Sequence, residues 1–170
     1  NATTITNNSA GTLLSIVPAA PAATPMIRIT GITFDAGTNI TKVLLHVGNS
    51  DSANPFRTFR IDHCAFRDSS SGTAITATGY TYGLLDHNYF YNNNQHISNE
   101  PNGIAMWQLY NKDANGKLIY SDLGMGGPDF LFIEDNYFYS TTNQDIILSY
   151  GARTVSRYNT FKKAYATMGE

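Results

Sequence analysis

The amino-acid sequence predicts an all-β fold built from stacked repeats, a solenoid, on three observations. The first is composition: the 170 residues include 14 Gly, 11 Tyr and 9 Phe, beside many Asn, Thr and Ser, which favour strands and tight turns over helices. The second is an octet that recurs five times, and the third is an apolar strand after each of the first four octets. A unit of this size cannot bury its own apolar face, so neighbouring units must stack.

The five octets align without gaps, and each one ends in phenylalanine. They are Ile27–Phe34, Phe59–Phe66, Gly83–Phe90, Leu131–Phe138 and Thr154–Phe161. Successive final phenylalanines are 32, 24, 48 and 23 residues apart, so a unit of 23–24 residues is twice lengthened by insertions. We expect the octets to lie side by side in one parallel sheet, with the phenylalanine rings stacked inside.

A second strand follows each of the first four octets, and the insertions enter beside it. The expected second strands are Ile40–Val47, Thr73–Thr78, Ile104–Tyr110 and Asp145–Tyr150. The smaller insertion is Gly48–Pro55 and the larger is about Asn111–Pro128. In the larger one, Asn115 and Gly116 stand between apolar arms, which is a strong short-range signal for a β-hairpin.

One position of the octet holds polar residues in three successive units. Its occupants are Ile32, Cys64, Asn88, Asn136 and Asn159. Asparagines at one turn position predict stacked side-chain amides, each bonded to the units above and below. Together with the phenylalanine column and the unit length, this ladder resembles the right-handed parallel β-helix of the pectate-lyase-like superfamily, over about residues 27–161.

The resemblance implies an all-β fold: a right-handed parallel β-helix solenoid of about five to six coils with a β-hairpin insertion. We expect residues 1–170 to form a single β-helix domain, with the hairpin at about 111–128. Both ends have the pattern of incomplete coils, so the chain is expected to be a segment of a longer one. Because this superfamily has many uses, function has to be argued from a site.

An outward position of the octet is expected to form a charged stripe on the solvent side. It holds Thr30, Asp62, Asp86, Glu134 and Arg157. Coils lie about 4.8 Å apart, and like charges this close are unfavourable unless they share a proton or bind a cation. One interpretation is a solvated stripe in which Arg157 pairs with Glu134. The other is a carboxylate cluster at a cleft walled by the two insertions.

The second interpretation leads to three kinds of chemistry. In a polysaccharide lyase, as the resemblance implies, Asp62, Asp86 and Glu134 would hold Ca²⁺, and Arg157 or Arg153 would be the base or the clamp for the sugar carboxylate. In a glycoside hydrolase, two acids on adjacent coils, such as Asp86 and Glu134, would suit retention. Two acids on alternate coils, Asp62 and Glu134, would suit inversion. A metal-binding adhesin would use the same acids without chemistry.

Histidines and aromatic residues are the candidates for contacts with a polysaccharide. His63 and His87 follow acids in adjacent coils, where they are either turn structure or ligand contacts. Trp107 lies on an expected strand, so packing in the core is at least as good an interpretation as contact with a sugar ring. The full set of substrate-binding candidates is His63, His87, His96, Trp107, Tyr110 and Tyr120.

Charge and composition exclude several classes of partner. The net charge is −2, and the lysines and arginines do not form the basic patch that nucleic-acid binding requires. No apolar run reaches the roughly 18 residues of a membrane span. The one cysteine, Cys64, excludes an internal disulfide and a cysteine-based zinc cluster. No strand-to-helix glycine loop supports an organic cofactor, so Ca²⁺ is the one cofactor expected.

The sequence therefore leaves two functional classes open. The first is an extracellular lyase or hydrolase that acts on an acidic polysaccharide. The second is a non-enzymatic structural or adhesive solenoid on a virion or cell surface, such as a tail-spike or fibre segment. In either class, further chain or a homotrimer would cover the open coil ends.

Overall fold

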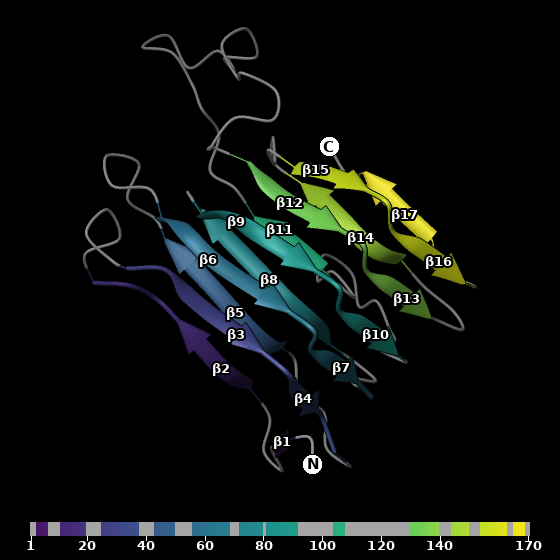
Figure 1. Ribbon diagram of the computed structural model, residues 1–170, viewed down its shortest axis with the longest axis horizontal. Helices are drawn as coiled ribbons and strands as arrows, with labels where there is room; N and C mark the ends of the chain where they lie inside the picture. The colour runs from purple at the N-terminus through teal and green to yellow at the C-terminus, as the bar shows by residue number, and fades with distance from the viewer. Residues whose placement is uncertain are drawn as a thin grey trace, which may run out of the picture.

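The computed structural model of the protein is all-β in its described residues and consists of three parallel sheets (Figure 1). The described residues are 3–6, 11–19, 25–37, 43–49, 56–68, 72–79, 81–91, 104–107, 130–139, 144–149, 154–162 and 165–168. Across these ranges, no helix has the length and apolar character needed to cross a membrane.

Sheet C contains the first half of every octet. Its strands are, in spatial order, β3 (Ile27–Thr30), β6 (Phe56–Asp62), β9 (Thr81–Asp86), β12 (Leu131–Glu134) and β15 (Thr154–Arg157). Ile29 pairs with Ile61, which pairs with Leu85, and Leu85 pairs with Ile133. The gapless alignment of the octets is therefore confirmed as the register of the sheet.

Sheet A contains the phenylalanine that ends every octet. Its strands are β1 (Thr3–Thr6), β4 (Ile32–Asp35), β7 (Ala65–Arg67), β10 (Tyr89–Tyr91), β13 (Tyr137–Tyr139) and β16 (Thr160–Lys162). The expectation that each octet lies in one sheet is therefore wrong, because each octet bends from sheet C into sheet A. The bend falls on one residue with a left-handed backbone, at Gly31, His63, His87, Asp135 and Tyr158, with φ between 52° and 68°.

Sheet B contains the second strands. They are β2 (Thr12–Ile16), β5 (Val43–Asn49), β8 (Thr73–Gly79), β11 (Ile104–Trp107), β14 (Gln144–Ser149) and β17 (Tyr165–Met168). All four expected second strands are thus present. The hairpin expected at about 111–128 lies outside the described residues.

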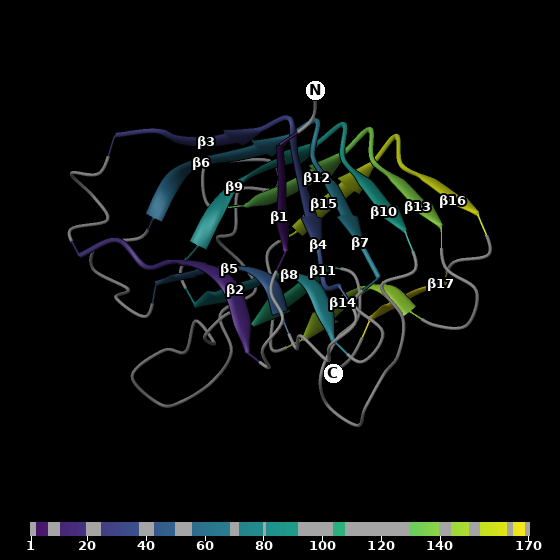
Figure 2. The same ribbon diagram turned by 90° about the horizontal axis from the view of Figure 1, so that it is seen from below.

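The chain visits sheets C, A and B in turn, since the neighbours of a strand are three elements away in chain order. Figure 2 shows sheet C along the top, sheet A down the right and sheet B along the bottom. Buried side chains from all three sheets form one core, for example Ile61, Phe66 and Ile75. This arrangement is consistent with a β-solenoid.

The expected stack of phenylalanines is confirmed in this core. The rings of Phe34, Phe66, Phe90, Phe138 and Phe161 follow one another with centroids 4.8–5.1 Å apart and planes within 10° of parallel. The first four side chains are at most 1% exposed. This stack fixes the register of sheet A, because a slip by one residue would turn every ring to the solvent.

The asparagine ladder is also confirmed. The Asn136 Oδ1 atom accepts hydrogen bonds from the backbone N–H and the side-chain Nδ2 of Asn88, at 2.9 and 3.1 Å. Asn136 in turn donates in the same way to Asn159 Oδ1 and, through Nδ2, to the Leu85 carbonyl at 2.9 Å. Each amide therefore satisfies buried backbone groups at the bend, which would otherwise cost free energy.

Cys64 occupies the same position one strand earlier. Its Sγ donates to the carbonyl oxygens of Asp62 and Ile29, at 3.3 and 3.7 Å, and its backbone N–H donates to Asn88 Oδ1 at 3.0 Å. Burial raises the pKa of the Cys64 thiol above its usual range, so the sulfur keeps its proton. The ladder thus begins with a thiol in place of an amide.

Candidate functional site

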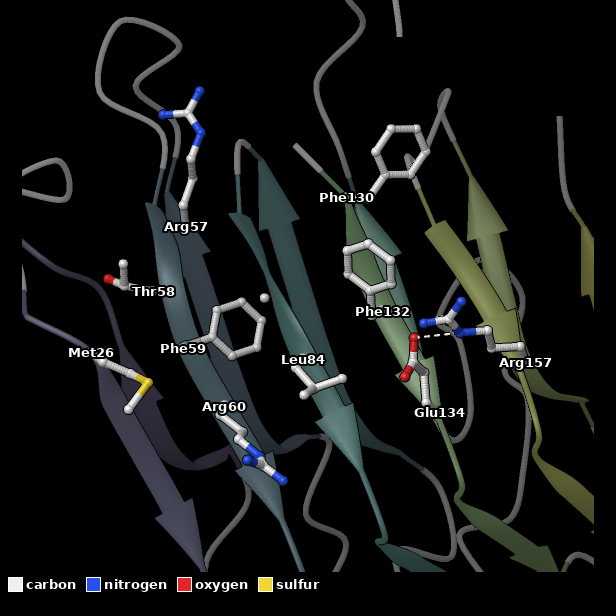
Figure 3. A pocket seen from close by; sticks show the side chains of 11 residues that line it. Met26, Arg57, Thr58, Phe59, Arg60, Leu84, Phe130, Phe132, Glu134 and Arg157 are labelled. Atoms are coloured by element: carbon white, nitrogen blue, oxygen red, sulfur yellow. Dashed lines mark hydrogen bonds and ion pairs between the residues drawn. The ribbon is translucent and has the colours of Figure 1, made fainter. Parts of the chain in front are cut away.

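A pocket of about 560 Å³ lies on the outer face of sheet C. It is lined by Met26, Arg57, Thr58, Phe59, Arg60, Gly83, Leu84, Phe130, Phe132, Glu134 and Arg157. Figure 3 shows Leu84 and Phe132 in the middle of this face and Arg60 and Arg157 on opposite sides of them. The volume and the mixture of apolar surface with a few charged groups are typical of ligand sites.

One column of sheet C explains why the pocket forms where it does. Arg28, Arg60, Leu84 and Phe132 occupy paired positions on β3, β6, β9 and β12. The column changes from cationic to apolar between β6 and β9. The apolar half forms the floor of the pocket, and Arg60 stands at its edge.

Gly83 shapes the same floor beside Phe59. A Cβ atom on Gly83 would lie 2.5 Å from the Phe59 carbonyl oxygen and 2.7 Å from the Phe59 ring. Real Cβ atoms do not approach other atoms this closely, so only glycine fits here. The missing side chain allows Phe59 and Gly83, which are paired in the sheet, to line the pocket together.

The expected stripe of exposed acids is wrong for two of its members. Asp62 is 0% exposed and Asp86 is 4% exposed. The reason is that arginines two positions earlier on the preceding strand cover them. Arg28 binds Asp62 through Nε and Nη2 at 2.8 and 2.7 Å, and Arg60 binds Asp86 through the same atoms at 2.9 and 2.6 Å.

The two-point hydrogen bonds from arginine occupy both carboxylates, and they keep that of Asp62 ionised. The hydrogen bond from Arg28 holds the pKa of Asp62 well below its usual range, against the opposite effect of burial, and hydrogen bonds from His63 and Thr30 act in the same direction as Arg28. Asp62 therefore cannot supply a proton near neutral pH. The repulsion that led us to expect Ca²⁺ is relieved by arginine instead.

The acidic side chains of sheet C pair with arginines and do not gather around a common point. In the described part of the chain, no three His, Cys, Asp or Glu side chains are grouped so that they could hold a metal ion. Asp62, Asp86 and Glu134 each have an arginine partner. The three carboxylates thus form three ion pairs along sheet C.

Glu134 and Arg157 form the ion pair that the sequence suggested. Arg157 Nε donates to Glu134 Oε1 at 2.7 Å, as the dashed line in Figure 3 marks. The guanidinium carbon of Arg157 lies 5.9 Å from the Phe132 ring centroid and 5.5 Å from that of Tyr158. Leu84 takes the place where an arginine would cover Glu134 from the preceding strand, so Glu134 pairs with the following strand instead.

The contact with Glu134 favours the charged form of Arg157. The hydrogen bond from Arg157 to Glu134 raises the pKa of the guanidinium above its already high usual value. A base for β-elimination would need the opposite shift. Arg157 can act as a positive clamp for an anionic group, because its side chain is half exposed at the edge of the pocket.

His63 and His87 lie together at the bend between sheets C and A, outside the pocket lining. Their rings are stacked, and each Nδ1 contacts the carboxylate of the preceding aspartate. The other contact candidates are not placed by the structure. His96, Tyr110, Tyr120 and Arg153 lie outside the described residues, and Trp107 ends β11 without a described side chain.

Two groups of residues escaped the sequence analysis. Arg28 and Arg60 pair diagonally with acids of the next unit, and a search down single columns does not reveal diagonal partners. Four tyrosines on sheet A flank the phenylalanine column, with centroids 5.3 Å apart for Tyr89 and Tyr137 and 5.4 Å apart for Tyr91 and Tyr139. The repeated Tyr-Phe-Tyr triplet was the available signal for this outer ladder.

The pocket can accept a ligand that combines apolar faces with negative charge. Its floor offers aromatic and aliphatic surface, and its edge offers guanidinium groups, which bind carboxylates well. The chain matches no family model, no curated protein and no solved structure. The chemistry of the pocket is therefore the basis for a ligand class.

Proposed function

We propose that this chain is part of an extracellular or virion-surface β-solenoid that binds an acidic polysaccharide on the outer face of sheet C. In finer detail, we propose the right-handed parallel β-helix of the pectate-lyase-like superfamily, with about five to six coils. Further chain or a homotrimer covers the coil ends in this proposal. Of the two classes that the sequence left open, the ion pairs favour the adhesive solenoid.

The observation that carries the proposal is the pocket with an apolar floor and arginines at its edge. Arg60 on β6 and Arg157 on β15 are separated by three strand spacings of about 4.8 Å, or about 14 Å. A polyuronate repeats its carboxylates along a rod and exposes apolar ring faces between them. Such a polymer can meet both arginines and the Leu84 and Phe132 surface at once.

The ion pairs support binding over cleavage. A hydrolase needs one acid that carries a proton and one free carboxylate. Asp62 and Asp86 are buried under arginines, and Glu134 is held by Arg157. A lyase needs a base, and Arg157 is held in its charged form. Lyase or hydrolase activity is therefore the alternative that the test below must detect.

The test is a binding titration of the full chain with oligogalacturonate and oligoalginate, beside neutral dextran, by calorimetry. We expect the two oligouronates to bind and dextran not to bind. The affinity for the oligouronates should fall at higher salt, because the contacts are charged. Arg157→Gln should weaken binding at least tenfold, since each charge-assisted contact to a carboxylate is worth about 1.5–3 kcal/mol. Parallel reactions with and without Ca²⁺ are followed by absorbance of the unsaturated product and by reducing ends.

The matched control is Arg67→Gln. Arg67 is a half-exposed arginine that is ion-paired with Asp35, as Arg157 is with Glu134, but it lies on sheet A away from the pocket. Its loss should leave the affinity unchanged. Equal losses in both variants, or equal binding of dextran, would contradict the pocket as the polysaccharide site. If the wild-type chain forms the unsaturated product and Arg157→Gln abolishes this reaction, the chain is a lyase and not an adhesive solenoid.

A further inference from the structure

The outer face of sheet A has two unlike halves. Figure 2 shows β4, β7, β10 and β13 side by side along this face. The tyrosine half, on β10 and β13, consists of the outward side chains of Tyr89, Tyr91, Tyr137 and Tyr139. The paired positions on β4 and β7 form the low half, with the short or charged side chains of Thr33, Asp35, Ala65 and Arg67. The boundary between the halves falls between β7 and β10.

The tyrosine half is exposed and already ordered. Tyr89 and Tyr91 are 43% and 37% exposed. Each ring stacks on the corresponding tyrosine of β13, with centroids 5.3 and 5.4 Å apart, and the two rings lie 6.2 Å from each other. Tyrosine is enriched at protein interfaces, and a side chain that is already held in place loses little entropy on binding. These rings are therefore suited to contact another protein surface.

The low half is able to receive such rings. Ala65 pairs with Tyr89 on the next strand, so the tyrosine column ends there at a single methyl group. Arg67 Nε donates to Asp35 Oδ2 at 2.8 Å, and Nη2 lies 2.7 Å from the same oxygen. This pair directs the guanidinium toward β4, away from the tyrosine half, while the Arg67 side chain remains 46% exposed. A ring placed here meets short side chains and one guanidinium group.

We propose that sheet A is the interface of a homodimer, in which the tyrosine half of each copy packs on the low half of the other. A two-fold axis parallel to the strands, between β7 and β10, produces this arrangement. Such an axis keeps positions along the strands and reverses the strand order, so β7 faces the partner's β10 and β4 faces the partner's β13. The contact is then closed and self-complementary, as in most homodimers.

Side-chain size favours this axis. The partner's Tyr89 lies over Ala65, and the partner's Tyr137 lies over Thr33, so a large side chain meets a small one at each position. Facing sheets pack about 10 Å apart with their side chains interdigitated. An axis through β10 would instead set Tyr89 and Tyr91 against the same residues of the partner, so that the rings would meet end to end.

Charge favours the same axis. Arg67 faces the hydroxyl group of the partner's Tyr91, whose oxygen can accept a hydrogen bond from a guanidinium N–H. The partner's Lys162, on β16, comes within one strand of Asp35, so opposite charges approach each other. A shift of the axis to between β10 and β13 would set Arg67 against the partner's Lys162, and the repulsion of like charges would oppose it.

The interface is separate from the sheet C pocket and from the coil ends, so the proposal stands independently of polysaccharide binding. The strands that form it are only three or four residues long, which limits the area that the dimer can bury. Small interfaces are typical of weak and transient complexes. We therefore expect a reversible dimer with a dissociation constant in the micromolar range.

The test is sedimentation equilibrium of the full chain across the micromolar range, together with NMR of a mixture of isotope-labelled and unlabelled protein. We expect an equilibrium between monomer and dimer. In the mixture, a nuclear Overhauser effect between a labelled and an unlabelled chain reports only contacts between copies. We expect this effect between the Ala65 methyl group and the Tyr89 ring.

Ala65→Tyr is the variant that separates the dimer from the fold. It adds a ring beside Tyr89 and so continues the tyrosine column of its own chain, but it fills the place of the partner's Tyr89. Dimer formation should weaken at least tenfold while the chain remains folded. Tyr158→Asn is the control and should leave dimer formation unchanged. Tyr158 is 73% exposed but lies at the bend outside sheet A, and asparagine tolerates the left-handed backbone there.

Four results would overturn the proposal. The first is a monomer throughout the micromolar range. The second is association that survives Ala65→Tyr, as contact through the coil ends would, or that Tyr158→Asn weakens equally. The third is an effect from Ala65 to Tyr137 in place of Tyr89, which would exclude the proposed axis.

The fourth result concerns a different occupant of the same face. Shifts of the four tyrosine signals on addition of dextran or oligogalacturonate, without association of the chain, would assign the face to carbohydrate. The first and third results need no variant, so a substitution that impairs folding does not leave the question open.

Discussion

Arg60 on β6 holds Asp86 on β9 through two hydrogen bonds and also lies 3.5 Å from Asp62 on its own strand. One guanidinium thus touches two buried carboxylates that are paired across the sheet. Two carboxylates this close would repel each other in isolation. Arginine therefore allows acids to stand on adjacent strands of sheet C without a metal ion.

The first prediction concerns the asparagine ladder. Asn136→Ala removes an amide that bonds both neighbouring strands and leaves buried backbone groups unpaired, so it should destabilise the protein by about 1–3 kcal/mol. Asn159→Ala should cost less, since Asn159 is only half-buried. Urea unfolding of the two variants provides the measurement. A larger loss for Asn159→Ala would show that the ladder does not stabilise the bend.

The second prediction concerns the thiol that begins the ladder. In Cys64→Asn, Nδ2 can donate to the Ile29 carbonyl as the Asn88 amide donates to that of Ile61, and Oδ1 can accept from the Ile32 N–H. We expect the melting temperature to equal or exceed that of the wild type. Cys64→Ala should lower it, because the contacts of Sγ with the Ile29 and Asp62 carbonyl oxygens are lost. A lower value for Cys64→Asn than for Cys64→Ala would refute the equivalence of these positions.

The third prediction concerns pH. The pKa of Asp62 is lowered in the folded state, chiefly by Arg28, so the unfolded state binds protons first as the pH falls. The stabilising contribution is complete above the unfolded pKa, about 3.9, and is lost as the pH falls from there toward the folded pKa. Wild type and Asp62→Asn should therefore differ most in stability above about pH 5.

The difference between these two proteins should narrow between pH 4 and pH 2. Thermal unfolding at several pH values gives this difference, in which the contributions of acids remote from Asp62 and its arginine partners cancel. A constant difference across the whole range would mean that the Asp62 carboxylate is not held ionised by its neighbours.

The fourth prediction concerns Gly83. In Gly83→Ala the new Cβ would meet the Phe59 backbone oxygen, which cannot move without breaking the pairing of β6 and β9. We expect a loss of about 1–3 kcal/mol, typical of overpacking. Gly48→Ala is the matched control, because the three atoms nearest to its Cβ would be side-chain atoms of His46 and Thr78. Calorimetric unfolding should rank Gly83→Ala as the less stable variant.

The parts of the fold that repeat down a column were predictable from the sequence. The phenylalanine stack and the amides of Asn88, Asn136 and Asn159 each occupy one position of the octet, and parallel pairing brings equal positions together. The bend within the octet was not predicted, although Gly31 and Asp135 stand in the same column as His63 and His87. Glycine, aspartate and histidine are among the residues most often found with a left-handed backbone, so this column carried the signal.

The candidate site was less predictable for a related reason. Asp62 was expected to face solvent, since its neighbours in the same column are charged. Arg28, which covers Asp62, lies on the preceding strand, two residues before the position that pairs with Asp62. That an arginine side chain reaches an acid at this diagonal position is visible only in the side-chain geometry. The pocket likewise depends on the change from Arg60 to Leu84, whose consequence appears only when the strands are assembled.

The diagonal pairing gives sheet C an interchangeable pattern. Arg28 and Arg60 hold the same position in the register, and so do their partners Asp62 and Asp86. A chain shortened by residues 59–82 would bring β3 directly against Gly83–Asp86, and Arg28 would then face Asp86 with the geometry it now has toward Asp62. The arginine–aspartate contact thus has the same form at both steps. Removing or inserting one unit would therefore leave no buried aspartate without an arginine partner.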